Sequence, residues 1–378
     1  MIYLDNAATS GFKPECVKAA INATLKNLSC NPGRSGHKLS INCLKLITKT
    51  RENIAKFFNC DNPDNVIFTK NCTEALNVAI LGSYVKGSHV VTSINEHNSV
   101  LRPLFELEKK GEISLTVCDL DENGNITYEN VKKCIKDNTS LICLNLVSNV
   151  TGGSLDMEKL GTLKGKNIKL ICDAAQAAGY IDIDMKKTGI DMLAFPGHKG
   201  LYGPTGTGGL CFMDKIKIRP LMFGGTGTES ENIYQPDGYP ENLESGTLNI
   251  VGIAGLNAGL NYIKEHKIRM RSQLKFLQKL FFDQCCKIKN IKIYSSKNHS
   301  GIISLLAEGY TSMETSDLLS AKYDIAVRGG LHCAPLVHKH LHTSKSGLVR
   351  FSLSSFNNFK EIAKALEALK EITKITAF

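Results

Sequence analysis

The stretch from Asp173 to Lys199 carries the residues best suited to chemistry. An apolar run, Ile168 to Cys172, precedes Asp173, and a second run, Asp191 to Phe195, precedes Pro-Gly-His-Lys. Because the carboxyl ends of parallel strands face a common crevice, we expect Asp173 and Lys199 on one wall of a site. A lysine that forms an imine and an aspartate that keeps a ring nitrogen protonated are what pyridoxal 5'-phosphate requires. Taken singly, Asp173 could be a helix N-cap and Lys199 an ordinary loop lysine.

Three other polar residues follow predicted strands. Thr73 lies where a strand runs into a helix, and as N-cap it would leave free N–H groups for a phosphate. His97 follows the run that ends at Ile94, and its imidazole can stack on a flat cofactor ring. Asn149 precedes a Thr-Gly-Gly turn, and its amide can reach a cofactor oxygen or a substrate carboxylate. Each also has a plain structural alternative as a cap, a loop residue or a turn residue.

A candidate nucleophile, Cys333, lies in a glycine-flanked turn outside any apolar run. His332 is adjacent, and Arg328 lies five residues earlier. Cationic neighbours lower the pKa of a thiol and increase the thiolate fraction that attacks. Because the chain has 13 cysteines, an ordinary loop cysteine is the alternative. Arg34 and His37, in a turn-rich loop before the helix predicted at 39–58, could be active-site residues or could only shape that loop.

Composition narrows the class of protein. The net charge is +10, but the lysines are scattered, Trp is absent, and no basic run is interleaved with aromatic residues, so we expect no nucleic-acid partner. No apolar stretch reaches the ~18 residues of a membrane helix, and the first residues lack the layout of a signal peptide. No Cys-x-x-Cys pair predicts zinc. The histidines at 338, 340 and 342 suggest a solvated turn rather than a metal site. We expect a cytoplasmic protein with reduced cysteines.

The apolar runs and helical patterns alternate through the first two thirds of the chain. Strands are predicted near 66–69, 89–94, 113–118, 141–146, 168–172, 191–195 and 208–213, with helices between most of them. This alternation predicts an α/β fold with a largely parallel seven-stranded sheet covered on both faces. We expect a large domain at 12–260 and a smaller α+β domain at 261–378, which the segment 1–11 joins to it.

Several of these stretches together resemble a known family. Tyr-Leu-Asp-Asn-Ala-Ala-Thr at the start, Asp-x-Ala-Gln at 173–176, Gly-His-Lys at 197–199 and the segment 327–335 resemble the class V, fold-type I pyridoxal-phosphate enzymes, and within them the type II cysteine desulfurases. The resemblance implies further site residues: Gln176 and His198 at the cofactor, with Arg350, Asn149 and Arg328 at the substrate. It also implies that Thr247 reaches the partner's phosphate site in a homodimer with shared active sites.

The reaction implied by the resemblance converts L-cysteine to L-alanine. Lys199 would remove the α-proton, and Cys333 would take the sulfur as a persulfide and pass it to an acceptor protein or a small thiol. Pro196 departs from the family, because many relatives have a hydroxyl residue there and proline offers neither a hydroxyl nor an N–H. The alternatives are an aminotransferase, a selenocysteine lyase or a cysteine sulfinate desulfinase. A more distant one is a non-enzymatic nucleic-acid or metal-binding protein.

Overall fold

A seven-stranded sheet forms the centre of the molecule. The computed structural model describes residues 1–33, 35–121, 125–165 and 167–375. The strands are β2 (Val66–Thr69), β3 (His89–Ser93), β4 (Ser114–Cys118), β5 (Thr139–Asn145), β6 (Lys169–Asp173), β7 (Met192–Pro196) and β8 (Gly208–Phe212). Their order is β2-β8-β7-β6-β5-β3-β4, and β8 alone runs opposite to the other six strands. The predicted α/β class and mostly parallel sheet are confirmed.

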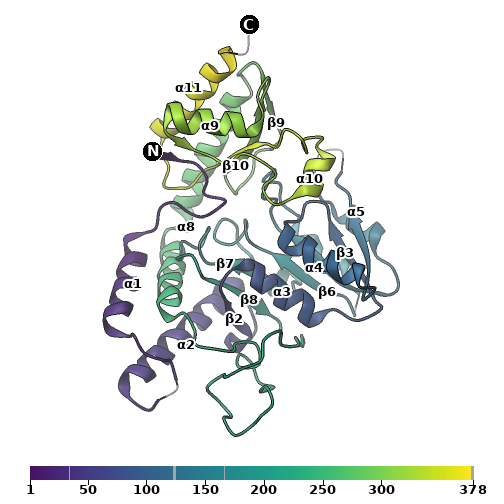
Figure 1. The fold of residues 1–378 in the computed structure, drawn as a ribbon, viewed down its shortest axis with the longest axis vertical. Coiled ribbons are helices and arrows are strands. Elements are labelled where there is room, and N and C mark those ends of the chain that lie inside the picture. Colours follow the sequence, from purple (N-terminus) through teal and green to yellow (C-terminus); the bar gives the residue numbers. More distant parts are fainter. Residues whose placement is uncertain (34, 122–124, 166, 376–378) are drawn as a thin grey trace.

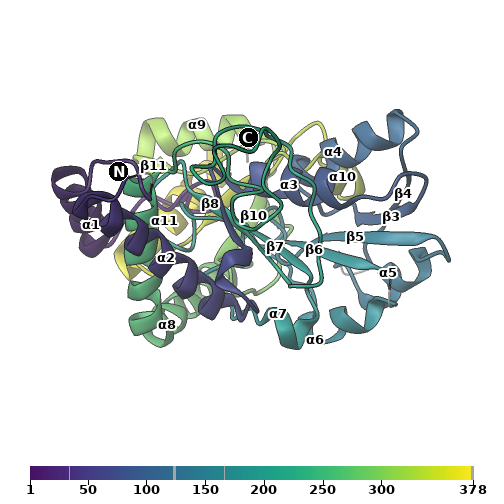
Figure 2. The ribbon, with the colours of Figure 1, turned by 90° about the horizontal axis from the view of Figure 1, so that it is seen from below.

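Helices cover both faces of this sheet (Figure 2). One face packs against α3 (Cys72–Ser83) and α4 (Asn98–Lys109), and the other packs against α2 (Lys38–Phe58), α5 (Tyr128–Cys134) and α7 (Met185–Thr188). Along β5, Leu141 and Cys143 enter the first core, whereas Ile142 and Leu144 enter the second. Because both faces are buried, the strands are apolar throughout rather than alternating. The helix α6 (Met157–Leu160) and two 3₁₀ turns, Pro63–Asn65 and Gly161–Leu163, complete this part.

A long helix, α8 (Ile250–Cys285), runs from the large sheet to a separate, smaller hydrophobic core (Figure 1). Its first half contributes Leu256 and Leu260 to the large core, and its second half contributes Leu277 and Phe281 to the small one. The predicted division at 260/261 thus falls inside a single helix. The small core covers an antiparallel sheet, β12-β10-β9. Its elements are β9 (Ile291–Ile293), β10 (Ile302–Ala307), α9 (Ser312–Tyr323), α10 (Pro335–His340), β12 (Val349–Ser352) and α11 (Phe359–Ile375).

The N-terminal segment contacts both parts of the molecule. Strand β1 (Ile2–Tyr3) pairs in parallel with β11 (Ile325–Ala326) beside the small sheet. A few residues later, the Ser10 N–H donates to the His198 carbonyl at 3.1 Å, in the loop that follows β7. The chain then enters α1 (Glu15–Asn27), which packs on α8. No helix within the described ranges has the length and apolar character needed to span a bilayer.

Candidate active site

Most of the predicted site residues line one cavity of about 100 Å³ at the carboxyl ends of β6 and β7. Its walls come from the ends of these strands and from the N-termini of α3 and α4. The predicted residues that line it are Thr73, His97, Asn149, Asp173, Gln176, His198 and Lys199. The expectation that Asp173 and Lys199 share a wall is therefore met. Pro196 also lines the cavity.

Asp173 has a structural contact as well as a place in the cavity. Its Oδ1 accepts from the Ala175 N–H at 2.7 Å, but turns rather than a helix follow it, so the helix N-cap that we considered as its alternative is not what the structure shows. The same oxygen accepts from the Cys72 thiol at 3.5 Å. Burial and the negative charge of Asp173 raise the pKa of Cys72, so this thiol stays protonated and acts as a donor.

Lys199 lies in the loop after β7. Burial lowers the pKa of its ammonium group, and the Asp173 carboxylate acts in the opposite direction. The neighbouring His198 has a pKa lowered to about 4 by burial and by the charges of Lys199 and Lys13, so its imidazole is neutral at physiological pH. Lys13 Nζ donates to the His198 carbonyl at 2.8 Å, which ties this loop to the N-terminal segment.

Thr73 is not the N-cap that the sequence predicted. The cap of α3 is Asn71, whose side chain accepts from the Glu74 N–H at 2.9 Å, and Thr73 is the second residue of the helix. The Thr73 hydroxyl instead lies 2.8 Å from the Ser99 hydroxyl. Thr73 nevertheless faces the cavity, at the helix N-terminus where backbone N–H groups favour an anion.

His97 is fixed by the start of α4. Its Nδ1 accepts from the Ser99 N–H at 3.1 Å, so the proton of the neutral ring is on Nε2. Burial lowers the pKa of His97, whereas the Asp173 charge raises it. His97 is thus a neutral ring in the cavity, in one tautomer and one orientation.

Three buried polar atoms around the cavity have no hydrogen-bond partner within the described part of the chain: Gln176 Oε1, Asn149 Oδ1 and His198 Nδ1. The other ends of the two amides are anchored, Gln176 Nε2 to the Ala7 carbonyl at 3.0 Å and Asn149 Nδ2 to the His332 carbonyl at 2.7 Å. Buried polar atoms are normally paired, so this set indicates a site built for a polar ligand.

Cys333 lies outside the cavity lining and is exposed. Its carbonyl accepts from the Asn98 N–H at 2.8 Å, and Arg328 Nη2 lies 3.7 Å from its sulfur. We expected His332 to contribute positive charge, but that expectation is wrong. Burial and the charge of Arg350 lower the pKa of His332 to about 2, and its Nε2 donates to the Leu348 carbonyl at 3.0 Å. The cation beside the thiol is Arg328.

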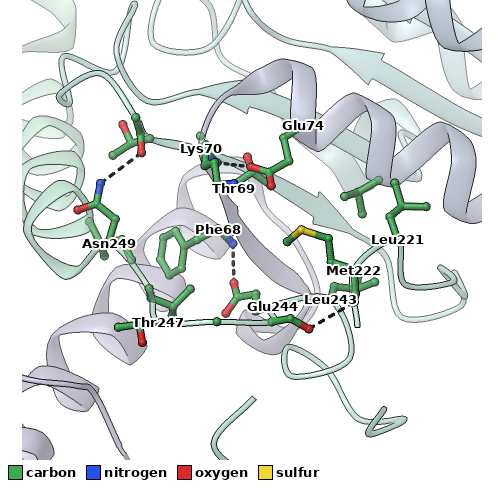
Figure 3. Close-up of a pocket in the computed structure, with 18 of the residues that line it drawn as sticks. Phe68, Thr69, Lys70, Glu74, Leu221, Met222, Leu243, Glu244, Thr247 and Asn249 are labelled. Atoms are coloured by element: carbon green, nitrogen blue, oxygen red, sulfur yellow. Dashed lines mark hydrogen bonds between the residues drawn. The ribbon is translucent and has the colours of Figure 1, made fainter. Parts of the chain in front are cut away.

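Thr247 is separate from these residues in a single chain. It lines a second, more apolar pocket of about 330 Å³, together with Phe68, Met222 and Leu243 (Figure 3). The Phe68 N–H donates to Glu244 Oε1 at 2.6 Å, which fixes the segment that carries Thr247 (Figure 3). Thr247 itself is exposed.

The structure also bears on the expectations for His338 and for the loop with Arg34 and His37. His338 is buried in α10, with Nδ1 at 2.8 Å from the Thr343 hydroxyl, so the predicted solvated turn is wrong at this residue. His37 caps α2 by accepting from the Ser40 N–H at 3.2 Å, and Arg34 lies outside the described residues. Within the described ranges, no group of three or more His, Cys, Asp or Glu side chains could hold a metal ion.

Comparison with known proteins decides the family. The model of the class V aminotransferases matches residues 2–365. The chain belongs to this family. It is 33% identical to a probable cysteine desulfurase of Methanothermobacter thermautotrophicus, over 98% of this chain and 94% of that protein. It is 34% identical to a probable cysteine desulfurase of Pyrococcus abyssi, over 99% and 94%. Its fold is similar to the apo cysteine desulfurase from Thermococcus onnurineus, with a TM-score of 0.92, 32% identity and coverage of 99% and 94%.

Sequence reasoning missed several residues of this class V site. Ser99 orients His97, and its position two residues after the histidine was a usable signal. Cys72, the neighbour of Thr73, was treated as one cysteine among many. Asp5 forms an ion pair with Arg350 at 3.0 Å. No local pattern reports a contact between residues so far apart in the chain.

Proposed function

We propose that this protein is a pyridoxal-phosphate-dependent cysteine desulfurase that converts L-cysteine to L-alanine and collects the sulfur on Cys333. The observation that carries the proposal is one cavity with Lys199 and Asp173 in its wall and Cys333, beside Arg328, tethered to its edge through the contact between His332 and Asn149. The relatives named as cysteine desulfurases, which match over nearly the full chain, support the same reading.

The cavity fits the cofactor because its walls offer the required partners. Asp173 would pair with the ring nitrogen, His97 would cover the ring face, and Thr73 with His198 would hold the phosphate; all four line the cavity. The unpaired Gln176 Oε1 and Asn149 Oδ1 belong to amides that can serve the remaining polar atoms of the ring. When bound, pyridoxal phosphate supplies an electron sink for bond changes at the substrate α-carbon.

The protein side chains move protons and hold the substrate. Burial lowers the pKa of the Lys199 ammonium group, which favours a role for its amine as the acceptor of the α-proton. Arg350, with Asn149 and Arg328 beside it, binds the α-carboxylate of the amino acid. A guanidinium suits this role because its N–H groups match the two oxygens of a carboxylate.

The sulfur step belongs to Cys333. Its thiolate attacks the substrate sulfur, an S–S bond forms, and the carbon–sulfur bond breaks with its electron pair on the substrate β-carbon. That carbon then takes a proton, and the product leaves as alanine. Arg328 is the cationic neighbour of this thiol, with Nη2 at 3.7 Å from the sulfur. An acceptor protein or a small thiol then removes the outer sulfur from the exposed Cys333.

The active unit in this proposal is a homodimer. Thr247 is exposed in one chain, in a pocket with mostly apolar walls that a partner subunit would cover. In that arrangement Thr247 would complete the phosphate site of the partner, which offsets the hydroxyl and N–H that Pro196 does not provide. The domains at 12–260 and 261–378 would then meet around the site.

Alanine formation from L-cysteine, with a reductant present, tests the proposal. We expect Cys333→Ala to reduce it by at least about 100-fold, because no nucleophile then accepts the sulfur. The matched control is Cys286→Ala, which removes another exposed thiol from the end of α8 and should leave the rate unchanged. Equal activity of Cys333→Ala and wild type would contradict the assigned nucleophile. Activity of Cys333→Ala on selenocysteine or cysteine sulfinate alone would favour the lyase alternatives.

A further inference from the structure

Arg350 forms a buried ion pair beside the cavity. Arg350 is 1% exposed, and its Nη2 lies 3.0 Å from Asp5 Oδ1. Its Nη1 donates at 3.0 Å to the carbonyl of Asn149, which lines the cavity. Each terminal nitrogen of a guanidinium carries two N–H groups. These two contacts use one N–H on each nitrogen, and the other two are left for a further anion.

The backbone on either side of Asp5 is fixed. The Leu4 N–H donates to the Ala326 carbonyl at 2.9 Å, and the Ser352 N–H donates back to the Leu4 carbonyl at 2.6 Å. On the other side, the Asn6 N–H donates to the Ser352 carbonyl at 3.2 Å. Because Ser352 lies two residues after Arg350 on β12, these bonds set the Asp5 carboxylate in register with the guanidinium.

The charges around this pair also match an incoming carboxylate. Arg328 and Arg350 lie opposite each other on paired backbone, with N–H to carbonyl distances of 3.3 and 2.8 Å. No described carboxylate forms an ion pair with Arg328. Asp5 therefore pairs with Arg350 only, and no described carboxylate pairs with Arg328, so the two guanidinium groups together favour the approach of an α-carboxylate.

We infer that Asp5 is a positioning residue for the substrate: it holds the Arg350 guanidinium in the orientation that binds the α-carboxylate. This inference rests on the proposed function, in which Arg350 binds the amino-acid substrate. Without Asp5, Arg350 would be a buried cation with one side unpaired and free to turn. Substrate affinity then falls, whereas the sulfur step at Cys333 does not depend on Asp5.

The test uses the holoenzymes of wild type, Asp5→Ala and Asp5→Asn. Binding of L-alanine and of L-alaninamide, which lacks the carboxylate, is measured from the absorbance change of the bound cofactor. We expect wild type to prefer L-alanine, and Asp5→Ala to lose about tenfold of this preference. The KM for L-cysteine should rise by about the same factor, with kcat within about twofold. Asp5→Asn keeps an acceptor oxygen and should recover most of the affinity.

The matched control is Asp182→Ala, which breaks an exposed Asp–Arg pair, with Arg271 at 2.7 Å, on the surface. It should leave both ligand affinities unchanged. An unchanged preference in Asp5→Ala, with wild-type cofactor absorbance as evidence of folding, overturns the role of Asp5 alone. Equal binding of the two ligands by wild type overturns the carboxylate role of Arg350 and, with it, this inference. If wild type does not turn over L-cysteine but prefers L-alanine, and Asp5→Ala loses that preference, the desulfurase proposal is overturned and the role of Asp5 stands.

Discussion

Glu96 is a buried carboxyl directly before His97. One oxygen accepts from the Ser93 hydroxyl at 2.6 Å and from the Asn145 N–H at 3.0 Å, and the other has no partner among the described residues. Burial raises the pKa of Glu96 from its ordinary value near 4.5 to about 8. The folded protein therefore holds this proton at pH values where the unfolded chain has released it.

The raised pKa of Glu96 makes the stability of the protein depend on pH. Because the unfolded chain binds fewer protons at this residue between about pH 4.5 and 8, the contribution of Glu96 to stability falls as the pH rises through that range. Glu96→Gln keeps the accepting oxygen and removes the titration. We expect wild type and variant to be similar at pH 5 and the variant to be more stable at pH 9, by an amount on the order of a few kcal/mol.

Thermal or denaturant unfolding across this pH range, at equal cofactor content, checks the prediction. Glu106→Gln changes an exposed carboxyl on α4 and should show a difference from wild type that does not vary with pH. A pH-independent difference for Glu96→Gln would show that the buried carboxyl is ionised at neutral pH.

At the level of single residues, the sequence predicted where residues lie better than it predicted their surroundings. Asp173 and Lys199 line one cavity, as their places after apolar runs indicated. Cys333 was placed correctly in a turn, but the role of His332 was wrong because the burial that makes this histidine neutral comes from distant residues. Burial of a polar residue is a tertiary property, and neighbours in sequence do not report it.

At the level of elements, the N-cap of α3 differs from the predicted one, and the difference can be tested. The cap is Asn71, two residues before the predicted Thr73, and both residue types are good caps, so composition alone could not choose between them. Asn71→Ala should lower the free energy of unfolding by about 1 kcal/mol, because the Glu74 N–H loses its acceptor.

Thermal unfolding of three variants checks this assignment. Asn71→Asp keeps the acceptor and adds a favourable charge at the helix N-terminus, so it should retain wild-type stability. In the cofactor-free protein, Thr73→Ala should leave the helix cap intact and remove the contact with the Ser99 hydroxyl. A larger loss for Thr73→Ala than for Asn71→Ala would contradict the capping pattern.

The strands were predictable and their directions only partly so. All seven runs became strands within two residues of the expected bounds, because a sheet buried on both faces requires continuous apolar segments. The antiparallel β8 is a short buried apolar run like the parallel strands, so the pattern indicated only a largely parallel sheet. The direction of β8 follows from its short connection after β7, which leaves no room for a crossover helix.

At the level of the whole molecule, exposed apolar side chains gather in the segment 221–234. Leu221, Met222, Phe223, Ile233 and Tyr234 are each at least 40% exposed, and Leu221 and Met222 line the pocket that contains Thr247 (Figure 3). Monomeric proteins rarely expose such a patch. It lies where the proposed homodimer would bury it.

Met222→Asp should therefore shift the protein toward monomer, because a charge is costly to bury in an apolar interface. Sedimentation velocity at several concentrations measures the shift. The control, Ile268→Asp, changes a residue of α8 that is 79% exposed and should leave the association unchanged. Monomeric wild type, or equal association of Met222→Asp and wild type, would contradict the placement of the interface.

The contacts of the N-terminal segment can form only late in synthesis of the chain. Ile2 and Tyr3 pair with Ile325 and Ala326, and Asp5 lies beside Ser352, so these residues are synthesised long before their partners. The large sheet and the helices that cover it are formed by residues well before 325, so they can fold before the partners of the N-terminal segment are synthesised. A nascent or truncated chain that stops before residue 350 lacks both the Asp5–Arg350 pair and the pairing of β10 with β12. Such a chain would have the residues that line the cofactor cavity but would lack the group that binds the carboxylate of an amino acid.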